Sequence, residues 1–293
     1  MQYFIIGANS SIGSYLYKRM KEDGLDVIGT GHVKNSNDEL LYYDILQDDI
    51  DSILQGKIDK PVLAIICIAM AQIDQCLLER ESAYQINIVK TKELIRYFTK
   101  QNIKVIYFSS EYVFDGEKGS YTEQDPTSPI NQYGYMKEEM EKYIAEYEPT
   151  VCVFRISKVV HTQRIDQNVF WQWERLQKNH ETIRCIKGNR MSFVCIEDIY
   201  QASLIVKNMG LCGIFNISGD VSYSRKELAE KFFEIAGMEE YRIEECEAAE
   251  FGFKERRPMD VSLDNRKFRE KTGYRFTPMD AVIESYIQNN IYV

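Results

Sequence analysis

Short apolar runs alternate with longer helical stretches through the first half of this 293-residue chain. The runs at 62–66 and 105–108 are continuously apolar, which is typical of strands buried on both faces. Between them, residues 81–100 place apolar side chains at helical spacing and predict one long helix. The predicted strands are 4–6, 27–28, 40–43, 62–66, 105–108 and 151–154. This alternation predicts an α/β protein with a Rossmann-like, doubly wound parallel sheet.

The strand and helix rhythm loosens after about residue 157. Helical patterns continue at 168–177, 197–207 and 224–236, and the last of these begins with Ser224 and Glu227 in capping-box positions. We expect residues 1–157 to form a dinucleotide-binding domain, to which roughly 194–216 return. Residues 158–193 and 217–293 should form a smaller C-terminal substrate-binding lobe.

The charge balance and the cysteines exclude several classes of function. With 36 Lys and Arg against 45 Asp and Glu, the formal charge of −9 argues against nucleic-acid binding. Seven cysteines without a CxxC pair indicate reduced thiols and neither a disulfide framework nor a metal site. The longest apolar run, 62–71, is about half the length of a membrane helix. We therefore expect a cytoplasmic protein that contacts no membrane.

A turn of small residues separates the first strand from a helix that keeps Leu16 and Met20 on one face. Such a turn presents backbone N–H groups to a pyrophosphate. Ser10 takes the middle glycine position of the G-x-x-G-x-x-G pattern, so its backbone either has a negative φ or tolerates some strain. A plain strand-to-helix turn remains the alternative. The candidate cofactor-binding residues are Gly7, Asn9, Ser10, Ser11, Ile12 and Gly13.

The end of the second strand lacks the carboxylate that would bind the ribose 2′-hydroxyl of NAD. Thr30, His32 and Lys34 stand there instead, and a hydroxyl, an imidazole and an ammonium suit a 2′-phosphate better. NADP(H) is therefore the preferred cofactor and NAD(H) the alternative. His32 and Lys34 could equally be solvated loop residues.

A tyrosine and a lysine four residues apart, Tyr133 and Lys137, share one helix face. An ammonium beside a phenol lowers the phenol pKa, so that the phenol can exchange a proton with a substrate oxygen. Ser109 and Ser110 follow the strand 105–108, where a hydroxyl would meet the same oxygen. A bare YxxxK pattern is common by chance, but these upstream serines favour a catalytic group of Ser110, Tyr133 and Lys137.

The sequence around these residues resembles the extended short-chain dehydrogenase/reductases, and within them the dTDP-4-dehydrorhamnose reductase group of nucleotide-sugar reductases. The resemblance rests on the stretch 108–116, on Tyr121-Thr122-Glu123, and on Asp125, Pro129, Tyr133-Gly134 and Lys137. Further matches are Asp44-Ile45, Asn87, residues 154–157, Asp198, Arg257-Pro258 and residues 262–264.

The resemblance implies an enzyme of polysaccharide biosynthesis that reduces the 4-keto group of a nucleotide-activated deoxysugar. Tyr133 would be the general acid, Lys137 would hold the nicotinamide ribose, and Ser110 would bind the carbonyl oxygen. Homodimers are usual in the family. Further cofactor residues implied are Asp44, Ile45, Ala69, Met70, Asn87, Ser109 and Ile156, and the implied substrate residues are Ala71, Ser110, Glu111, Tyr112, Tyr133, Ser157 and Arg257.

Some positions depart from the family pattern. Glu111 replaces an aspartate, and residues 158–161 replace a Trp-Val-Tyr-Gly run, so the identity of the sugar stays open. Two alternatives to a reductase remain: a nucleotide-sugar epimerase or dehydratase with a tightly held cofactor, and a non-catalytic NADP-binding regulatory subunit. Because the whole chain is acidic, we expect the first helix N-terminus, Lys34, Lys137 and Arg257 to form a local basic cleft.

Overall fold

The computed structural model describes residues 2–33, 39–55 and 61–290, and these residues divide into two compact units. Unit 1 comprises Met1–Ser109, Gln132–Phe154 and Ser203–Ile214. Unit 2 comprises Ser110–Asn131, Arg155–Ala202 and Phe215–Val293. Within the described ranges, no helix is long and apolar enough to cross a membrane.

Unit 1 is built on a seven-stranded sheet of order β11-β6-β5-β4-β1-β2-β3. The pairs β1–β2, β1–β4, β4–β5 and β2–β3 are parallel. All six predicted strands are present, and the predicted Rossmann-like fold class is confirmed. The strands are β1 (Gln2–Ile6), β2 (Asp26–Gly31), β3 (Leu41–Tyr42), β4 (Pro61–Ile66), β5 (Lys104–Ser110), β6 (Cys152–Ile156) and β11 (Gly213–Ile217).

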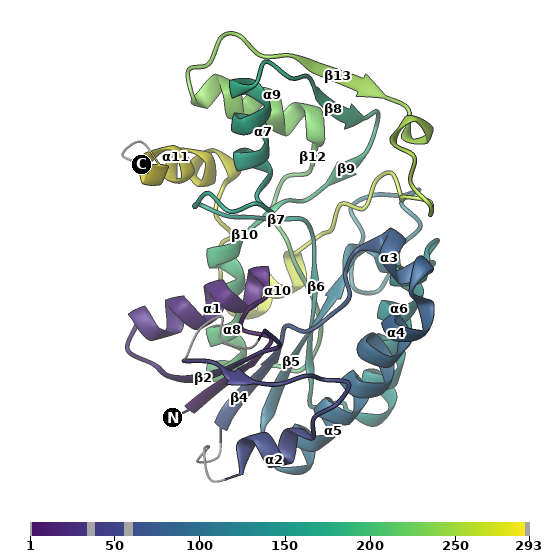
Figure 1. Ribbon diagram of the computed structural model, residues 1–293, viewed down its shortest axis with the longest axis vertical. Coiled ribbons are helices and arrows are strands. Elements are labelled where there is room, and N and C mark those ends of the chain that lie inside the picture. Colours follow the sequence, from purple (N-terminus) through teal and green to yellow (C-terminus); the bar gives the residue numbers. More distant parts are fainter. Residues whose placement is uncertain (1, 34–38, 56–60, 291–293) are drawn as a thin grey trace. The chain divides into compact units, whose positions relative to one another are not determined.

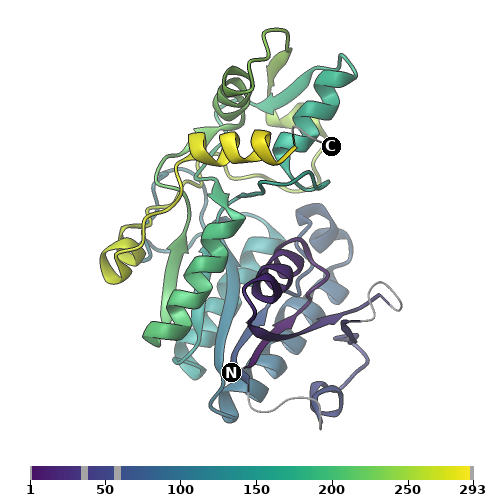
Figure 2. The same cartoon turned by 90° about the vertical axis from the view of Figure 1, so that its left-hand side faces the viewer.

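Helices cover both faces of this sheet: α1 lies on one face, and α5 and α6 lie on the other (Figures 1 and 2). The helix predicted at 81–100 is an α4–η1–α5 succession whose middle part is a π-helix. Its apolar side packs into the sheet, where the Phe4 and Phe98 rings lie 5.7 Å apart. The helices are α1 (Ser11–Glu22), α2 (Ile50–Leu54), α3 (Ile73–Leu78), α4 (Arg80–Tyr84), η1 (Gln85–Lys90), α5 (Thr91–Lys100) and α6 (Gln132–Tyr147).

Unit 2 has short strands and its own aromatic core. The helices predicted at 168–177, 197–207 and 224–236 are α7, α8 and α9, with Asn168 and Ser224 as N-caps of the first and last. The strands are β7 (Val159–Val160), β8 (Ile183–Ile186), β9 (Arg190–Met191), β10 (Val194–Cys195), β12 (Tyr223–Ser224) and β13 (Ile243–Cys246). The helices are η2 (Glu111–Val113), α7 (Val169–Lys178), α9 (Arg225–Ile235), η3 (Ala248–Phe251), α10 (Arg266–Thr272) and α11 (Met279–Asn290). Helix α8 (Ile196–Met209) begins in unit 2 and continues into unit 1 from Ser203 onward.

Two differences separate these units from the expected domains: residues 110–131 belong to unit 2, and the segment that returns to unit 1 is Ser203–Ile214 where roughly 194–216 was expected. The Asn216 side chain donates to the carbonyl oxygens of Tyr121 (2.8 Å) and Asp264 (2.9 Å). The Tyr121 N–H in turn donates to the carbonyl oxygen of Ser262 at 2.8 Å. These bonds tie the segment after β5 to the C-terminal part of the chain, and sequence periodicity carries no trace of them.

We expect Phe232→Ala to destabilise unit 2 by about 3–5 kcal/mol, because the side chain is fully buried and stacks on Phe170 at 5.1 Å. Denaturant unfolding would measure the loss. Leu78→Ala is the control, since Leu78 is 69% exposed. An equal effect of the two substitutions would contradict the assignment of Phe232 to the core.

Candidate dinucleotide pocket and active site

The turn between β1 and α1 has the close packing that the glycine pattern predicts. Gly7 has a φ of +87°, and a Cβ on Gly13 would lie 2.2 Å from the Gly7 carbonyl oxygen. Ser10 has a φ of −78° and caps α1, its Oγ accepting the Gly13 N–H at 3.1 Å. Ser10 is therefore an unstrained N-cap residue, and the missing middle glycine costs the turn nothing.

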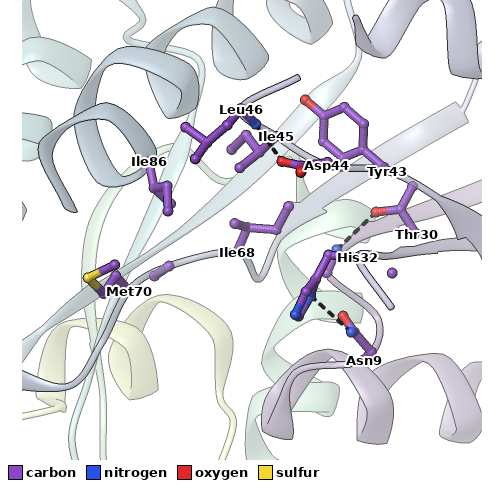
Figure 3. A pocket seen from close by; sticks show the side chains of 13 residues that line it. Asn9, Thr30, His32, Tyr43, Asp44, Ile45, Leu46, Ile68, Met70 and Ile86 are labelled. Carbon is purple, nitrogen blue, oxygen red and sulfur yellow. Dashed lines mark hydrogen bonds between the residues drawn. The ribbon is translucent and has the colours of Figure 1, made fainter. Parts of the chain in front are cut away.

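A cavity of about 300 Å³ lies beside this turn in unit 1 (Figure 3). Its lining includes eight of the predicted cofactor residues: Gly7, Asn9, Thr30, His32, Asp44, Ile45, Ala69 and Met70. Sequence reasoning missed Gly31, Tyr43, Leu46, Ile68 and Ile86, of which all but Ile86 lie at or just after strand ends. The position at or just after a strand end could therefore have identified the first four of these residues from the sequence. We call this cavity the dinucleotide pocket.

The polar groups around the end of β2 hold one another in place. Thr30 Oγ1 accepts the Gly7 N–H at 3.1 Å, and Asn9 Nδ2 donates to His32 Nδ1 at the same distance (Figure 3). Asp44 is the one acidic residue among the described residues that line the pocket, and its Oδ1 accepts the Leu46 N–H at 2.9 Å. Lys34 lies outside the described residues.

Asn87 does not line the dinucleotide pocket but positions one of its walls. Its Oδ1 accepts the Met70 N–H and its Nδ2 donates to the Met70 carbonyl oxygen, each at 2.9 Å. The side chain therefore holds both backbone polar groups of Met70 and orders the chain after β4.

Tyr133 and Lys137 lie one turn apart near the start of α6. Lys137 Nζ donates to the Phe108 carbonyl oxygen at 2.7 Å and to the Tyr107 hydroxyl at 3.2 Å. It lies 5.6 Å from the centre of the Tyr133 ring. Burial lowers the pKa of Lys137 to about 8, against the opposing influence of Cys76 and Glu141, so the side chain is still an ammonium at neutral pH.

The two serines at the end of β5 have different partners. Ser109 Oγ donates to Glu141 Oε1 at 2.5 Å within unit 1, so its predicted cofactor contact gains no support from the side chain. Ser110 Oγ donates to Glu111 Oε2 at 2.9 Å. Burial raises the pKa of Glu111 to about 7, although this hydrogen bond and Lys158 act in the opposite direction.

A second cavity of about 300 Å³ lies wholly in unit 2, and we call it the lobe pocket. Three predicted substrate residues line it: Glu111, Tyr112 and Arg257. Sequence reasoning named residues 158–161 only as a departure and missed Arg184 and Arg225. The lining is Glu111, Tyr112, Lys158, Val169, Arg184, Ile186, Asn189, Met191, Phe193, Arg225, Phe251, Phe253 and Arg257.

Other predicted site residues line neither cavity. Ala71 is exposed after Met70, Ile156 ends β6, and Ser157 is buried with no hydrogen-bond partner for its Oγ in the described part of the chain. Of the two tryptophans, Trp173 lies in the unit 2 core, and Trp171 stacks under Arg164 at 5.1 Å. Neither tryptophan lines the dinucleotide pocket or the lobe pocket.

The strand–glycine turn–helix junction, the pocket at the ends of parallel strands and the Tyr–Lys pair define a dinucleotide-binding protein of the extended short-chain dehydrogenase/reductase type. Residues 1–291 match the profile of the family described as "RmlD substrate binding domain", and the chain belongs to that family. The resemblance to nucleotide-sugar reductases, and with it the expectation of an oxidoreductase, is confirmed.

Relatives of known name span most of the chain. The probable low-salt glycan biosynthesis reductase Agl14 of Haloferax volcanii is 25% identical over 269 residues, 90% of each chain. The dTDP-4-dehydrorhamnose reductase of Aggregatibacter actinomycetemcomitans is 25% identical over 282 residues, 92% of each. Methionine adenosyltransferase 2 subunit beta of Danio rerio is 24% identical over 232 residues, 76% of this chain and 70% of that one.

Solved structures share the fold. The crystal structure of dTDP-4-dehydrorhamnose reductase from Bacillus anthracis in complex with NADP aligns with a TM-score of 0.85. It is 23% identical, and the alignment covers 99% of both chains.

We expect Gly13→Ala to weaken dinucleotide binding at least tenfold, because the new Cβ would force α1 away from the Gly7 carbonyl oxygen. Fluorescence titration with NADPH would measure the affinity. Ser14→Ala, a change at the next position of the same helix, is the control. Unchanged NADPH affinity in Gly13→Ala would contradict the prediction that the pyrophosphate binds at this turn.

We expect the stability of the wild type to fall relative to Glu111→Gln as pH rises from about 4.5 to 7. The folded state holds the Glu111 proton up to about pH 7, whereas the unfolded state releases it near its ordinary value of 4.5. The difference should reach up to about 3 kcal/mol and stay level above pH 7. Denaturant unfolding across this range, with Glu239→Gln at an exposed position as control, would show a flat difference if Glu111 were not buried.

Proposed function

We propose that this protein is an NADP(H)-dependent reductase that acts on the 4-keto group of a nucleotide-activated deoxysugar. The observation that carries the proposal is the Tyr133–Lys137 pair on α6. The Lys137 ammonium donates a hydrogen bond to the Phe108 carbonyl oxygen near the end of β5. The match to a family of nucleotide-sugar reductases supports the same chemistry.

The residues of this chain would handle the proton and the substrate oxygen. When bound, the reduced nicotinamide supplies a hydride to the keto carbon. Tyr133 donates its phenolic proton to the oxygen, which becomes the new hydroxyl group. The positive charge of Lys137 favours the phenolate that is left. Ser110 would turn its one hydroxyl proton from Glu111 to the substrate oxygen. The dinucleotide fits the glycine turn, because Gly7 and Asn9 line the pocket and α1 begins directly after them at Ser11.

The preference for NADP(H) rests on the groups at the end of β2. His32 lines the dinucleotide pocket, and no carboxylate follows β2 directly within the described part of the chain. The Bacillus anthracis protein with the same fold was solved with NADP. Comparison of kcat/KM for NADPH and NADH would test the preference, and NAD(H) would be assigned if the ratio favoured NADH.

Two other functions give different results in the same assays. An epimerase or dehydratase would copurify with its cofactor and consume no net NADPH. A regulatory subunit, favoured by the similarity to methionine adenosyltransferase 2 subunit beta, would form a stable complex with another enzyme. We also expect action in the cytoplasm, on a small nucleotide-sugar substrate, and assembly as a homodimer.

Tyr133→Phe should lower kcat by about 10²–10⁴-fold and leave NADPH affinity nearly unchanged, because only the proton donor is lost. Steady-state oxidation of NADPH with a panel of 4-keto-6-deoxy nucleotide sugars would measure the loss. Tyr135→Phe is the matched control, since Tyr135 is 52% exposed on the same helix. Wild-type protein that oxidises NADPH with none of these sugars would refute the proposed function.

A further inference from the structure

Four cationic side chains line the lobe pocket, and two of them already have local partners. Arg184 pairs with Glu250 at 3.2 Å and lies 5.0 Å over the Phe251 ring. Arg257 lies 4.4 Å over the Phe253 ring and donates to the Glu255 carbonyl oxygen at 3.1 Å. Aromatic faces and neighbouring oxygens thus balance these two charges.

The other two cations, Lys158 and Arg225, form no ion pair with a carboxylate among the described residues, although the Arg225 guanidinium lies 5.9 Å over the Trp173 ring. Lys158 lies between β6 and β7 and lines the pocket, and its ammonium makes no hydrogen bond or ion pair with the described residues. Arg225 begins α9; its Nε is buried without a partner in the same part of the chain, and its Nη2 reaches Gln172 only at 3.5 Å. Burial and the nearby Arg225 charge lower the pKa of Lys158. The two cations therefore repel each other in the lobe pocket, which both of them line.

Glu111 is the acidic residue that lines the lobe pocket with Lys158 and Arg225, and its charge is too small to neutralise both cations. It shares its carboxylate with the Ser110 hydroxyl, and at a pKa of about 7 it is only half ionised at neutral pH. Two cations therefore face at most one negative charge in a cavity that a small molecule could enter. The Arg225 Nε is buried without a partner in the described part of the chain, and such a charged donor is costly unless a ligand supplies an acceptor.

We propose that Lys158 and Arg225 together bind an oxyanion of the substrate in the lobe pocket. The inference rests on the proposed function, because it takes the ligand of this pocket to be a nucleotide sugar. An ammonium and a guanidinium that line one cavity suit a group with several charged oxygens, either a phosphate of the diphosphate or a carboxylate on the sugar. The pair would set specificity without taking part in proton transfer.

Calorimetry on the full chain tests the pair with seven probes. They are pyrophosphate, UDP, dTDP, and the UDP and dTDP derivatives of glucose and of glucuronate. Lys158→Met and Arg225→Gln should each weaken at least one probe by about ten- to a hundredfold, as loss of a charged hydrogen bond does. Lys226→Met is the matched control: Lys226 adjoins Arg225 but pairs with Glu245 at 3.1 Å and does not line the pocket. Thermal midpoints of all variants check folding.

The substitution Glu111→Gln should change the probe affinity in the opposite direction. This test does not require the Lys158 and Arg225 variants to fold. It removes the competing negative charge, so the same probe should bind more tightly, most clearly above pH 7.

The probes separate the two sources of the oxyanion. Weaker binding of pyrophosphate and both nucleoside diphosphates assigns the pair to the diphosphate. Weaker binding of the glucuronate derivatives alone, with the glucose derivatives unchanged, assigns it to a sugar carboxylate. Variants that bind every probe as Lys226→Met does, or a wild type that binds none, would overturn the inference. Pyrophosphate binding that depends on the pair without turnover of any nucleotide sugar would refute only the proposed function.

Discussion

The close approach of α1 to the end of β1 is the constraint on which the dinucleotide pocket depends. Gly13 packs so tightly on the Gly7 carbonyl that no side chain fits between them. Thr30 completes the junction from β2: its hydroxyl oxygen accepts the Gly7 N–H, and its carbonyl oxygen accepts the Ala8 N–H at 2.7 Å. Strand, turn and helix are thereby locked together, and the helix N-terminus faces the site where a pyrophosphate would need it.

Charge is organised differently from what an acidic chain suggested. Lys137, expected in a local basic cleft, is buried in unit 1, where its ammonium donates to the Phe108 carbonyl oxygen and the Tyr107 hydroxyl. Arg257 lines a pocket of unit 2, where Lys158, Arg184 and Arg225 join it. Positive charge in this protein of net charge −9 is therefore collected locally, in a cavity that the sequence does not reveal.

Features that depend on neighbouring residues were predictable. The continuous apolar runs identified the strands, and Asn168 and Ser224 marked helix starts because a cap acts within one turn. The Tyr133–Lys137 spacing placed both side chains on one face of α6 for the same reason. The π-helix within 81–100 escaped prediction, since its apolar pattern is almost that of an α-helix.

The order of neighbouring residues thus determined the strands, the caps, the glycine turn and the Tyr133–Lys137 spacing, because these depend on residues a few positions apart. Tertiary structure alone decided that residues 110–131 join unit 2, that Ser109 turns to Glu141, and that Asn87 holds Met70. It also brought Lys158 and Arg225 to one pocket from positions 67 residues apart. Burial, hydrogen-bond partners and pKa values are set by such distant neighbours, and no periodicity along the chain encodes them.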